Sequence, residues 1–247
     1  VKQKKTGDLP KLMIFLHEIT RTIGNMSNYV DINQALCDAS QASRKLAFAN
    51  EEMINEVLRA LADEISIRAD EILDANAADL ALMNEEDPKF DRLKLTRERL
   101  TDIASDMRHV ATLPSPVGKT LEERTLPNGL ELKKVSVPFG VIGVIYEARP
   151  NVSFDVFALC FKSGNACVLK GGHEADRSNR AIVRTIHAVL NRKGFDPNCV
   201  VLLPPDREAT LQLLHANGKV DLIIPRGSSR LISFVRQEAT VSVIETG

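Results

Sequence analysis

The sequence predicts an α/β fold with a Rossmann-like, doubly wound parallel sheet, preceded by N-terminal helices and a β-hairpin. The first observation is the stretch VSVPFGVIGVIYEARPNVSFDVFALCFKSGNACVLKGG at 135–172, which reads as strand, turn, helix and strand. The second is the alternation of strand and helix patterns from there to the end of the chain. Such alternation indicates parallel strands joined by right-handed crossovers.

Composition bounds the class of protein. The chain has 247 residues, of which 44% are hydrophobic, enough for one large domain or two small ones. Its 32 basic and 33 acidic residues give a net charge of −1, so charge offers no reason to expect nucleic acid or an anionic membrane as a partner. No apolar run approaches the roughly 20 residues that span a bilayer.

The cysteines and histidines do not have the spacing of metal ligands. The four cysteines lack CxxC spacing and the five histidines show no paired spacing, so we expect no metal site. Three cysteines lie inside apolar runs, as is typical of buried, reduced thiols in a cytosolic protein, and we expect a cytoplasmic location. The cysteines are Cys37, Cys160, Cys167 and Cys199.

Residues 1–25 differ in pattern from everything that follows. Three lysines precede a short apolar segment, which resembles a signal peptide but is too short and is interrupted by His17-Glu18. We expect a leader or an upstream extension that is separate from the fold.

An N-terminal helical segment is predicted at 26–113. Residues 31–48 form an alanine-rich helical pattern, Asn50 can cap a long helix that continues to Leu73, and Thr96 can cap a third helix. Alternating charges along the long helix indicate a solvated face. A helix-bundle recognition role is the alternative interpretation of these charges.

A hairpin is predicted at 114–139. A proline-rich break precedes two alternating runs, 121–126 and 130–137, which flank the turn Pro127-Asn128-Gly129. Asn-Gly between such runs is a strong hairpin signal.

The nucleotide-binding core is predicted at 140–247. An apolar run at 141–145 is typical of a strand that is covered on both faces, and Arg149-Pro150 ends it. Asn151 can cap the next helix, whose apolar residues are Val152, Phe154, Val156, Phe157, Leu159 and Phe161. The strand at 166–169 then delivers Lys170 at its carboxyl end, the edge where open α/β sheets bind ligands.

Helix and strand patterns continue to the end of the chain. We expect helices at 175–190, 206–215 and 228–239, and strands at 200–203, 220–224 and 241–245. The chain stops directly after the last strand, where a domain rarely ends, so we expect that it is cut from a longer protein.

Phosphate-binding candidates follow two of these strands. The GxGxxG fingerprint is absent, since Gly140 and Gly143 lie within a strand. The helix that opens at Gly227 and Ser228 has free N–H groups that suit an anion, although an ordinary glycine turn with Ser228 as the helix cap fits as well. Lys170, followed by Gly171 and Gly172 at a strand end, suits a ribose or phosphate contact, and the alternative is a solvated lysine. The nearest acid that could bind a ribose hydroxyl is Glu174. The candidates are Lys170, Gly171, Gly172, Arg226, Gly227, Ser228 and Ser229.

Two further residues are candidates for catalysis. The amide of Asn151 either caps its helix or donates to an oxyanion at the mouth of the sheet. Glu245 is either a general base or a polar strand end.

Four segments together resemble the aldehyde dehydrogenase superfamily: GVIGVIYEARPN, GNACVLKGG, PRGSSRLI and VIETG. Within it, VPFGVIGVIYEARPNVS, LKGGHEADRSN, DLIIPRGS and the opening YVDINQALCDASQASRKLA resemble the γ-glutamyl phosphate reductases. The resemblance covers about residues 27–247, or roughly the N-terminal half of a family member. It implies that the catalytic and oligomerisation domains lie after residue 247.

This resemblance implies reduction of L-glutamate 5-phosphate to L-glutamate 5-semialdehyde with NADPH, in proline biosynthesis. A cysteine thiolate displaces phosphate and hydride then reduces the thioester. The resemblance also implies that Lys170 contacts the adenosine ribose or its 2′-phosphate, that Gly227 and Ser228 face the pyrophosphate, and that Asn151 stabilises the oxyanion. Glu245 aligns with the family's deacylating base. A reductase has less need of this role, because hydride transfer releases its product.

The chain departs from the family in one respect, because none of its four cysteines stands at the position of the nucleophile. We therefore expect the chain alone to be inactive. The resemblance also implies that the full-length protein is a homo-oligomer with functional coupling to glutamate 5-kinase. The alternatives are a stand-alone nucleotide-binding module without catalysis, or a reductase of another acyl substrate.

Overall fold

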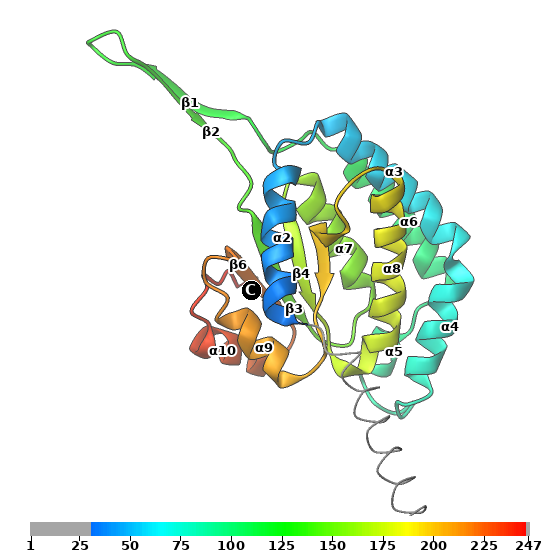
Figure 1. Cartoon of the computed structure of the whole chain (residues 1–247). Coiled ribbons are helices and arrows are strands. Elements are labelled where there is room, and N and C mark those ends of the chain that lie inside the picture. Colours follow the sequence, from blue (N-terminus) through cyan, green and yellow to red (C-terminus); the bar gives the residue numbers. More distant parts are fainter. Residues whose placement is uncertain (1–30, 246–247) are drawn as a thin grey trace, which may run out of the picture. The chain divides into compact units, whose positions relative to one another are not determined.

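The computed structural model describes residues 31–245, and the predicted leader at 1–25 lies outside this range. A four-stranded parallel sheet with the order β5-β4-β3-β6 lies at the centre of residues 32–245 (Figure 1). The strands are β3 (Val141–Tyr146), β4 (Ala166–Lys170), β5 (Val200–Leu202) and β6 (Leu222–Arg226). The order places β4 and β5 on one side of β3 and β6 on the other, so the doubly wound fold class is confirmed.

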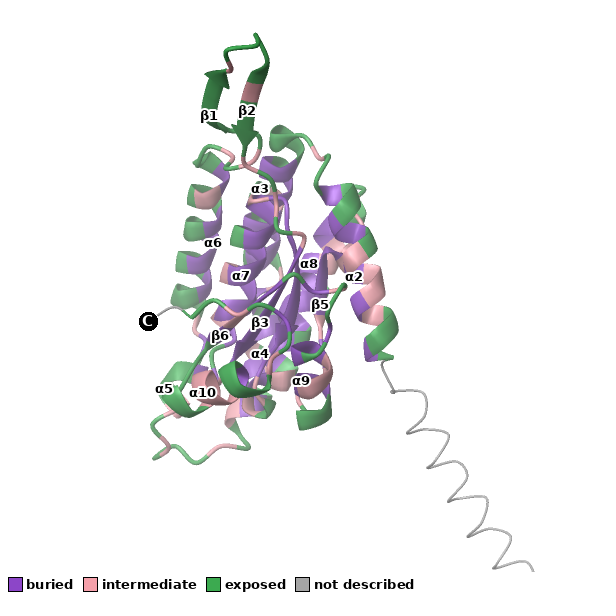
Figure 2. Cartoon of the chain, turned by 90° about the vertical axis from the view of Figure 1, so that its left-hand side faces the viewer, coloured by how far each residue is buried: buried purple, intermediate pink, exposed green. Residues whose placement is uncertain are grey.

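Helices cover both faces of the sheet, because residues along each strand alternate between the faces. Val141 and Ile145 pack in one core with α2 (Ile32–Leu46), α9 (Arg207–Leu214) and α10 (Ser229–Glu238). Ile142 and Val144 belong to the other core. Its helices are α3 (Glu51–Ile67), α6 (Arg97–Thr112), α7 (Asn151–Lys162) and α8 (Asp176–Arg192). The sheet is buried on both faces, as the unbroken apolar runs predict (Figure 2).

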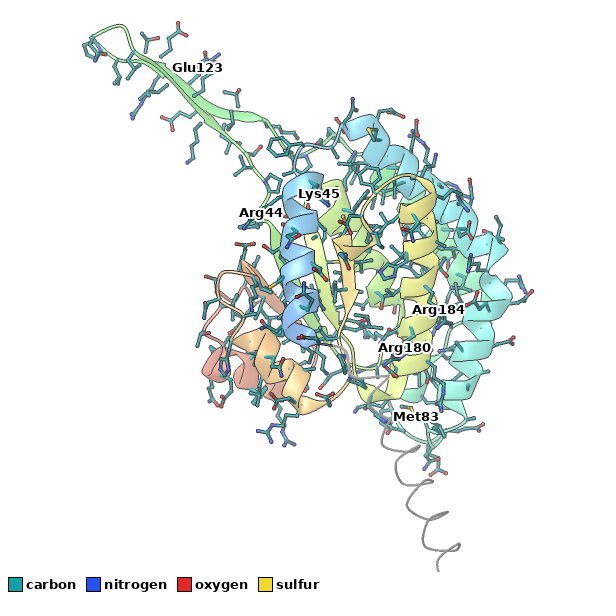
Figure 3. The ribbon with its side chains drawn as sticks, viewed as in Figure 1. Arg44, Lys45, Met83, Glu123, Arg180 and Arg184 are labelled. Atoms are coloured by element: carbon teal, nitrogen blue, oxygen red, sulfur yellow. The ribbon has the colours of Figure 1, made fainter. Side chains whose placement is uncertain are left out.

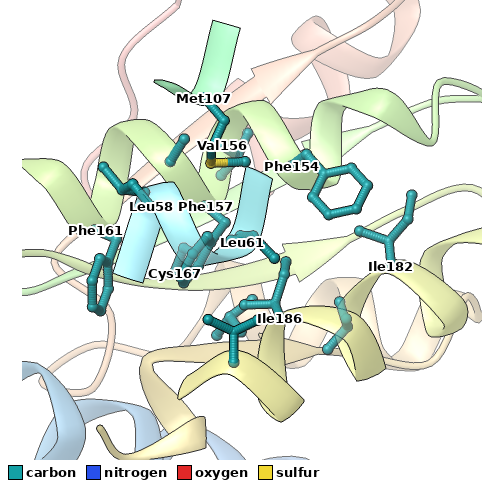
Figure 4. Close-up of a cluster of buried hydrophobic side chains, with 14 of the residues drawn as sticks. Leu58, Leu61, Met107, Phe154, Val156, Phe157, Phe161, Cys167, Ile182 and Ile186 are labelled. Atoms are coloured by element: carbon teal, nitrogen blue, oxygen red, sulfur yellow. The ribbon is translucent and has the colours of Figure 1, made fainter. Parts of the chain in front are cut away.

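Aromatic residues of α7 lie at the centre of the larger core. Phe154, Phe157 and Phe161 are fully buried beside Leu58 and Leu61 of α3 (Figure 4). The rings of Phe157 and Phe161 stack with their centroids 5.0 Å apart. The helix predicted here is confirmed, except that Leu159 is 56% exposed instead of covering the core.

Asn151 does not cap α7. Pro150 occupies the cap position with helical backbone angles (φ −62°, ψ −29°), so Asn151 is already inside the first turn. A residue with helical geometry cannot turn its side chain back to the free N–H groups. Its amide donates instead to Asp155 one turn later, at 3.2 Å.

The N-terminal helices follow the sequence prediction with one correction. Asn50 accepts a hydrogen bond from the N–H of Glu52, and Thr96 accepts one from the N–H of Arg99, so both caps are confirmed. The single long helix to Leu73 is wrong: α3 ends at Ile67, and α4 (Ala69–Leu80) begins after Arg68 (φ −97°, ψ 15°). This break lets α4 pack against α8. The short helix α5 (Phe90–Leu93) then connects α4 to α6.

The hairpin prediction is confirmed. β1 (Thr120–Thr125) and β2 (Glu131–Val135) pair antiparallel and extend away from the sheet (Figure 1). Two 3₁₀ turns, η1 (His173–Ala175) and η2 (Pro197–Cys199), complete the elements of the described chain.

The last predicted strand, 241–245, is reduced to one bridge between Val243 and Ile223 of β6. The N–H of Ile223 donates to the carbonyl of Ser242, and Ile223 accepts from the N–H of Ile244. In a parallel ladder the next donor on β6 would be residue 225, two positions on. Residue 225 is a proline and has no N–H, so the ladder stops there.

Candidate functional site

The candidate site lies along the carboxyl ends of the strands. In the order β5-β4-β3-β6, the chain reverses direction across the sheet between β3 and β6, and open α/β sheets bind ligands at such a switch point. Three neighbouring pockets line this edge. We call them the lysine, arginine and asparagine pockets, after Lys170, Arg149 with Arg226, and Asn151.

The lysine pocket has a volume of about 500 Å³ and brings together predicted residues from distant parts of the chain: Lys170, Gly171, Gly172 and Ser228. Lys170 is only 6% exposed. Its ammonium donates to the carbonyls of Gly171 at 3.1 Å and Pro205 at 3.2 Å. Within residues 31–245 it has no carboxylate within 4.0 Å.

Burial lowers the pKa of the Lys170 ammonium below its usual 10.5, while the charges of Asp206, Glu174 and Asp176 act in the opposite direction. A buried ammonium without a close counter-ion is costly unless an anion approaches it. The solvated lysine that the sequence left open does not describe this residue.

Hydrogen-bonded side chains pack against Gly171. The hydroxyl of Tyr146 and that of Ser153 are 2.7 Å apart, and Ser153 donates to the amide oxygen of Asn179 at 3.0 Å. A Cβ at Gly171 would collide with the Asn179 amide, so a glycine is required by close packing. Burial raises the pKa of Tyr146, which stays a neutral hydrogen-bonding phenol.

Glu147 occupies the start of α10. Its carboxylate accepts a hydrogen bond from the backbone N–H of Ser228 and another from the Ser228 hydroxyl, each at 3.0 Å. A Cβ at Gly227 would lie 2.8 Å from Oε2 of Glu147, so the glycine permits this approach. Ser228 is also the N-cap of α10, because its hydroxyl accepts from the N–H of Leu231. The helix opening thus already holds an anionic group of the chain itself.

The arginine pocket has a volume of about 380 Å³ and adjoins the lysine pocket through Tyr146 and Glu147, which line both. It contains two of the predicted residues, Arg226 and Gly227. Arg149, three residues after the strand β3, contributes a second guanidinium.

The asparagine pocket has a volume of about 340 Å³ and shares Arg92 and Arg149 with the arginine pocket. Asn151 lines it beside Asp155. Burial raises the pKa of Asp155, and the hydrogen bond from Asn151 partly offsets this effect. The three pockets therefore form a continuous series from Lys170 to Asn151.

Three predicted or considered residues lie outside this series. Ser229 begins α10 but lines none of the three pockets. Glu245 is 3.6 Å from Arg236 in an ion pair and also lines none of them. Glu174 pairs with Lys89 at 2.9 Å, and the pKa of Glu174 is lowered although burial opposes the shift.

Sequence reasoning missed four charged residues at the lysine pocket, one of which is Asp206 at the start of α9. Glu147 follows β3, and its position at the end of a buried strand could have indicated it. Arg207 lies over the ring of Phe234 at 5.7 Å, and Arg230 lines the same pocket. No local pattern marks either arginine, because α9 and α10 approach the strand ends only in the folded chain.

The thiols are not arranged for nucleophilic catalysis. Cys160, Cys167 and Cys199 are buried, as predicted, and Cys37 is half-buried. Burial raises the pKa of Cys199 to about 12. The hydrogen bond with Cys160, together with burial, raises the pKa of Cys167. Thiols with raised pKa values are poor nucleophiles.

Among residues 31–245, no group of three or more His, Cys, Asp or Glu side chains could hold a metal ion. None of the helices in this range has the length and apolarity needed to cross a membrane.

Comparisons with known proteins agree with this geometry. Residues 16–246 match the model of the aldehyde dehydrogenase family. The γ-glutamyl phosphate reductase of Bacteroides fragilis is 59% identical over 218 residues, which are 88% of this chain and 52% of that protein. That of Chlorobaculum parvum is 57% identical over 90% of this chain and 53% of that protein. The chain spans about half the length of these curated relatives.

Solved structures show the same fold. The γ-glutamyl phosphate reductase of Thermotoga maritima superposes with a TM-score of 0.85 at 34% identity, over 88% of this chain and 54% of that one. The Saccharomyces cerevisiae enzyme of the same name gives a TM-score of 0.80 at 30% identity, over 88% of this chain and 56% of that one.

Proposed function

This chain belongs to the aldehyde dehydrogenase family, and from that premise we propose that it is the coenzyme-binding part of an enzyme that reduces L-glutamate 5-phosphate to L-glutamate 5-semialdehyde with NADPH. The relatives named γ-glutamyl phosphate reductase support the reaction, which serves proline biosynthesis. The series of pockets along the sheet edge supports the assignment of a coenzyme site.

One observation carries the proposal. Lys170 is a buried ammonium with two carbonyl partners and, among residues 31–245, no carboxylate within 4.0 Å, and it lines the same pocket as Ser228 at the start of α10. An ammonium and a helix N-terminus both attract phosphate groups. The aromatic ring of Phe234 lines the same pocket and offers a surface for a base. The residues present therefore fit a dinucleotide phosphate.

The chain's own residues take these roles. Lys170 holds the adenosine ribose or its 2′-phosphate, and the N–H groups at Gly227 and Ser228 face the pyrophosphate. Asn151 donates its amide to the acyl oxygen at the far end of the series. The bound coenzyme supplies hydride. Glu245 has no assigned step, because it is exposed and paired with Arg236.

Further properties of the whole protein follow from the same proposal. It is cytoplasmic, forms a homo-oligomer and is functionally coupled to glutamate 5-kinase. The nucleophile is a cysteine outside the four of this chain, since none of the four stands at the position of the family's nucleophile, and Cys160, Cys167 and Cys199 are also buried.

Coenzyme binding and catalysis are tested separately. Titration of the chain with NADPH, followed by nicotinamide fluorescence, should show saturable binding that excess NADP⁺ reverses and excess AMP reverses only weakly. Phosphate-dependent reduction of NADP⁺ by glutamate 5-semialdehyde should stay at background for this chain and proceed with the full-length Bacteroides fragilis relative. Absence of NADPH binding, or displacement by AMP as effective as by NADP⁺, would contradict the assignment.

A further inference from the structure

The arginine pocket has an excess of positive charge. Four basic side chains and a single carboxylate, Glu147, line it: Lys89, Arg92, Arg149 and Arg226. The asparagine pocket, by contrast, has four carboxylates against four basic groups. A second anion at this edge of the sheet is therefore favoured in the arginine pocket and disfavoured beside Asn151.

The guanidinium groups of this pocket lack partners in the described chain. Arg92, Arg149 and Arg226 have no carboxylate within 4.0 Å among residues 31–245. Elsewhere arginines are commonly paired: Arg180 with Asp176 at 2.8 Å and Arg184 with Glu71 at 3.2 Å, both on the α8 face in Figure 3. Three unpaired guanidinium groups around one cavity are an arrangement suited to a phosphate, which arginine binds through two parallel N–H donors.

Lys89 does not compete for this role. Its ammonium pairs with Glu174 at 2.9 Å, and this hydrogen bond raises the pKa of Lys89. The three arginines therefore carry the charge that is free to meet a ligand.

The backbone explains why the arginines meet. Arg149 follows β3 by three residues and Arg226 ends β6, and these two strands are direct neighbours in which Tyr146 pairs with Arg226. Arg92 comes from α5, far earlier in the chain. The switch point of the sheet thus collects positive charge from three separate segments.

We propose that the arginine pocket binds the phosphoryl group of the acyl phosphate substrate, with Arg149, Arg226 and Arg92 as its ligands. This inference rests on the proposed function, which it deepens by giving the coenzyme-binding half a share in substrate recognition. The pocket lies between the lysine pocket and the asparagine pocket. A phosphoryl group held there places the attached acyl group next to Asn151, on the side away from the coenzyme's adenosine end.

Inorganic phosphate is the probe, because it is the product that leaves this site. In a ¹H–¹⁵N spectrum of the whole chain at low salt, phosphate should shift the Nε–Hε signals of Arg149 and Arg226 to saturation. The double variant Arg92→Gln/Arg149→Gln should weaken phosphate binding about tenfold or more, as expected for lost charge-assisted bonds. Arg124→Gln, which removes an exposed hairpin arginine outside the pocket, should leave it unchanged.

NADPH affinity of the same variants separates this inference from the proposed function. If the double substitution leaves the affinity for phosphate unchanged, or if phosphate does not shift the arginine Nε–Hε signals, the phosphoryl site is overturned even if NADPH binds normally. If the unmodified chain does not bind NADPH but binds phosphate in a way that depends on the arginines, the coenzyme assignment is contradicted and the phosphoryl site is retained. Because the arginines are exposed, an unchanged backbone spectrum should show that the variants stay folded; the single variant Arg149→Gln repeats the test.

Discussion

The carboxylate of Glu147 accepts both the backbone N–H and the hydroxyl of Ser228 at 3.0 Å, so one of the two N–H groups proposed for the coenzyme pyrophosphate, that of Ser228, is already bound within the chain. A carboxylate and a diphosphate cannot take the same donors, and like charges at this distance repel. Binding of the coenzyme therefore requires Glu147 to move away from α10.

Glu147→Gln should tighten NADPH binding about 3- to 10-fold, because it removes a charged competitor whose interaction is weakened by solvent. The measurement is a fluorescence titration of both proteins. Glu123→Gln on the hairpin, which breaks an exposed pair with Lys133, serves as the control and should change nothing (Figure 3). Weaker binding by the Glu147 variant would instead make this carboxylate a coenzyme ligand, such as an acceptor for a ribose hydroxyl.

The pH dependence of the free energy of unfolding should show that the buried carboxylate of Glu64 stabilises the contact between α3 and α8. Its carboxylate is buried and accepts from Arg68 at 2.6 Å and Arg192 at 2.8 Å. The hydrogen bond from Arg68 is the main cause that lowers the pKa of Glu64 below 4.5. A lowered pKa in the folded state adds stability above pH 4.5, and this stability is lost as the pH falls through the folded-state value.

Glu64→Gln should lower the free energy of unfolding by about 1–2 kcal/mol at neutral pH, a value reduced for the partly exposed arginines. The loss should shrink as the pH falls below 4.5 towards the lowered folded-state pKa, through which Glu64 of the unmodified chain becomes protonated. Urea unfolding followed by circular dichroism measures both values. Glu56→Gln, at an exposed pair with Lys193, is the control, and equal losses in the two variants would argue against a special role for Glu64.

The thiols should react in an order set by burial. Iodoacetamide at mildly alkaline pH should modify Cys37 first, and Cys160, Cys167 and Cys199 only after unfolding in urea. Mass spectrometry of the native and unfolded chain gives the sites. Rapid native labelling of any buried cysteine would reopen the question of a nucleophile within this chain.

Coenzyme binding should weaken at alkaline pH. Because burial lowers the pKa of Lys170, the free chain loses this charge below pH 10.5, the usual lysine value. A phosphate bound to the ammonium favours the protonated form, so binding takes up a proton as the pH approaches that lowered pKa. NADPH affinity should fall there with rising pH, and Lys170→Met should remove this dependence; a variant that keeps it would assign the titration to another group.

The secondary structure was largely predictable because local rules decided it. The unbroken apolar runs of β3 and β4 predicted burial on both faces, and Asn-Gly predicted the hairpin. The errors arose where one residue acted against a pattern. Pro225 ends the ladder that the apolar residues at 241–245 would continue, and Pro150 takes the cap position from Asn151.

The site was predictable in part. Lys170 and Ser228 follow strands, and strand ends converge in a parallel sheet, so their common pocket followed from topology. The arginine pocket did not, since Arg92 joins it from a short helix with no signal of its own. Glu147 was missed because its partner lies 81 residues away in the sequence.

The central claim is that Lys170 reads the phosphate that distinguishes NADPH from NADH, and the most direct measurement is the affinity of Lys170→Met for both coenzymes by calorimetry. We predict a loss of roughly 10- to 150-fold for NADPH, from a charge-assisted contact of about 1.5–3 kcal/mol, and a smaller loss for NADH. Lys45→Met, at an exposed pair with Asp196, should bind both as the unmodified chain does (Figure 3). Equal losses for NADPH and NADH, or no loss for either, would contradict the account.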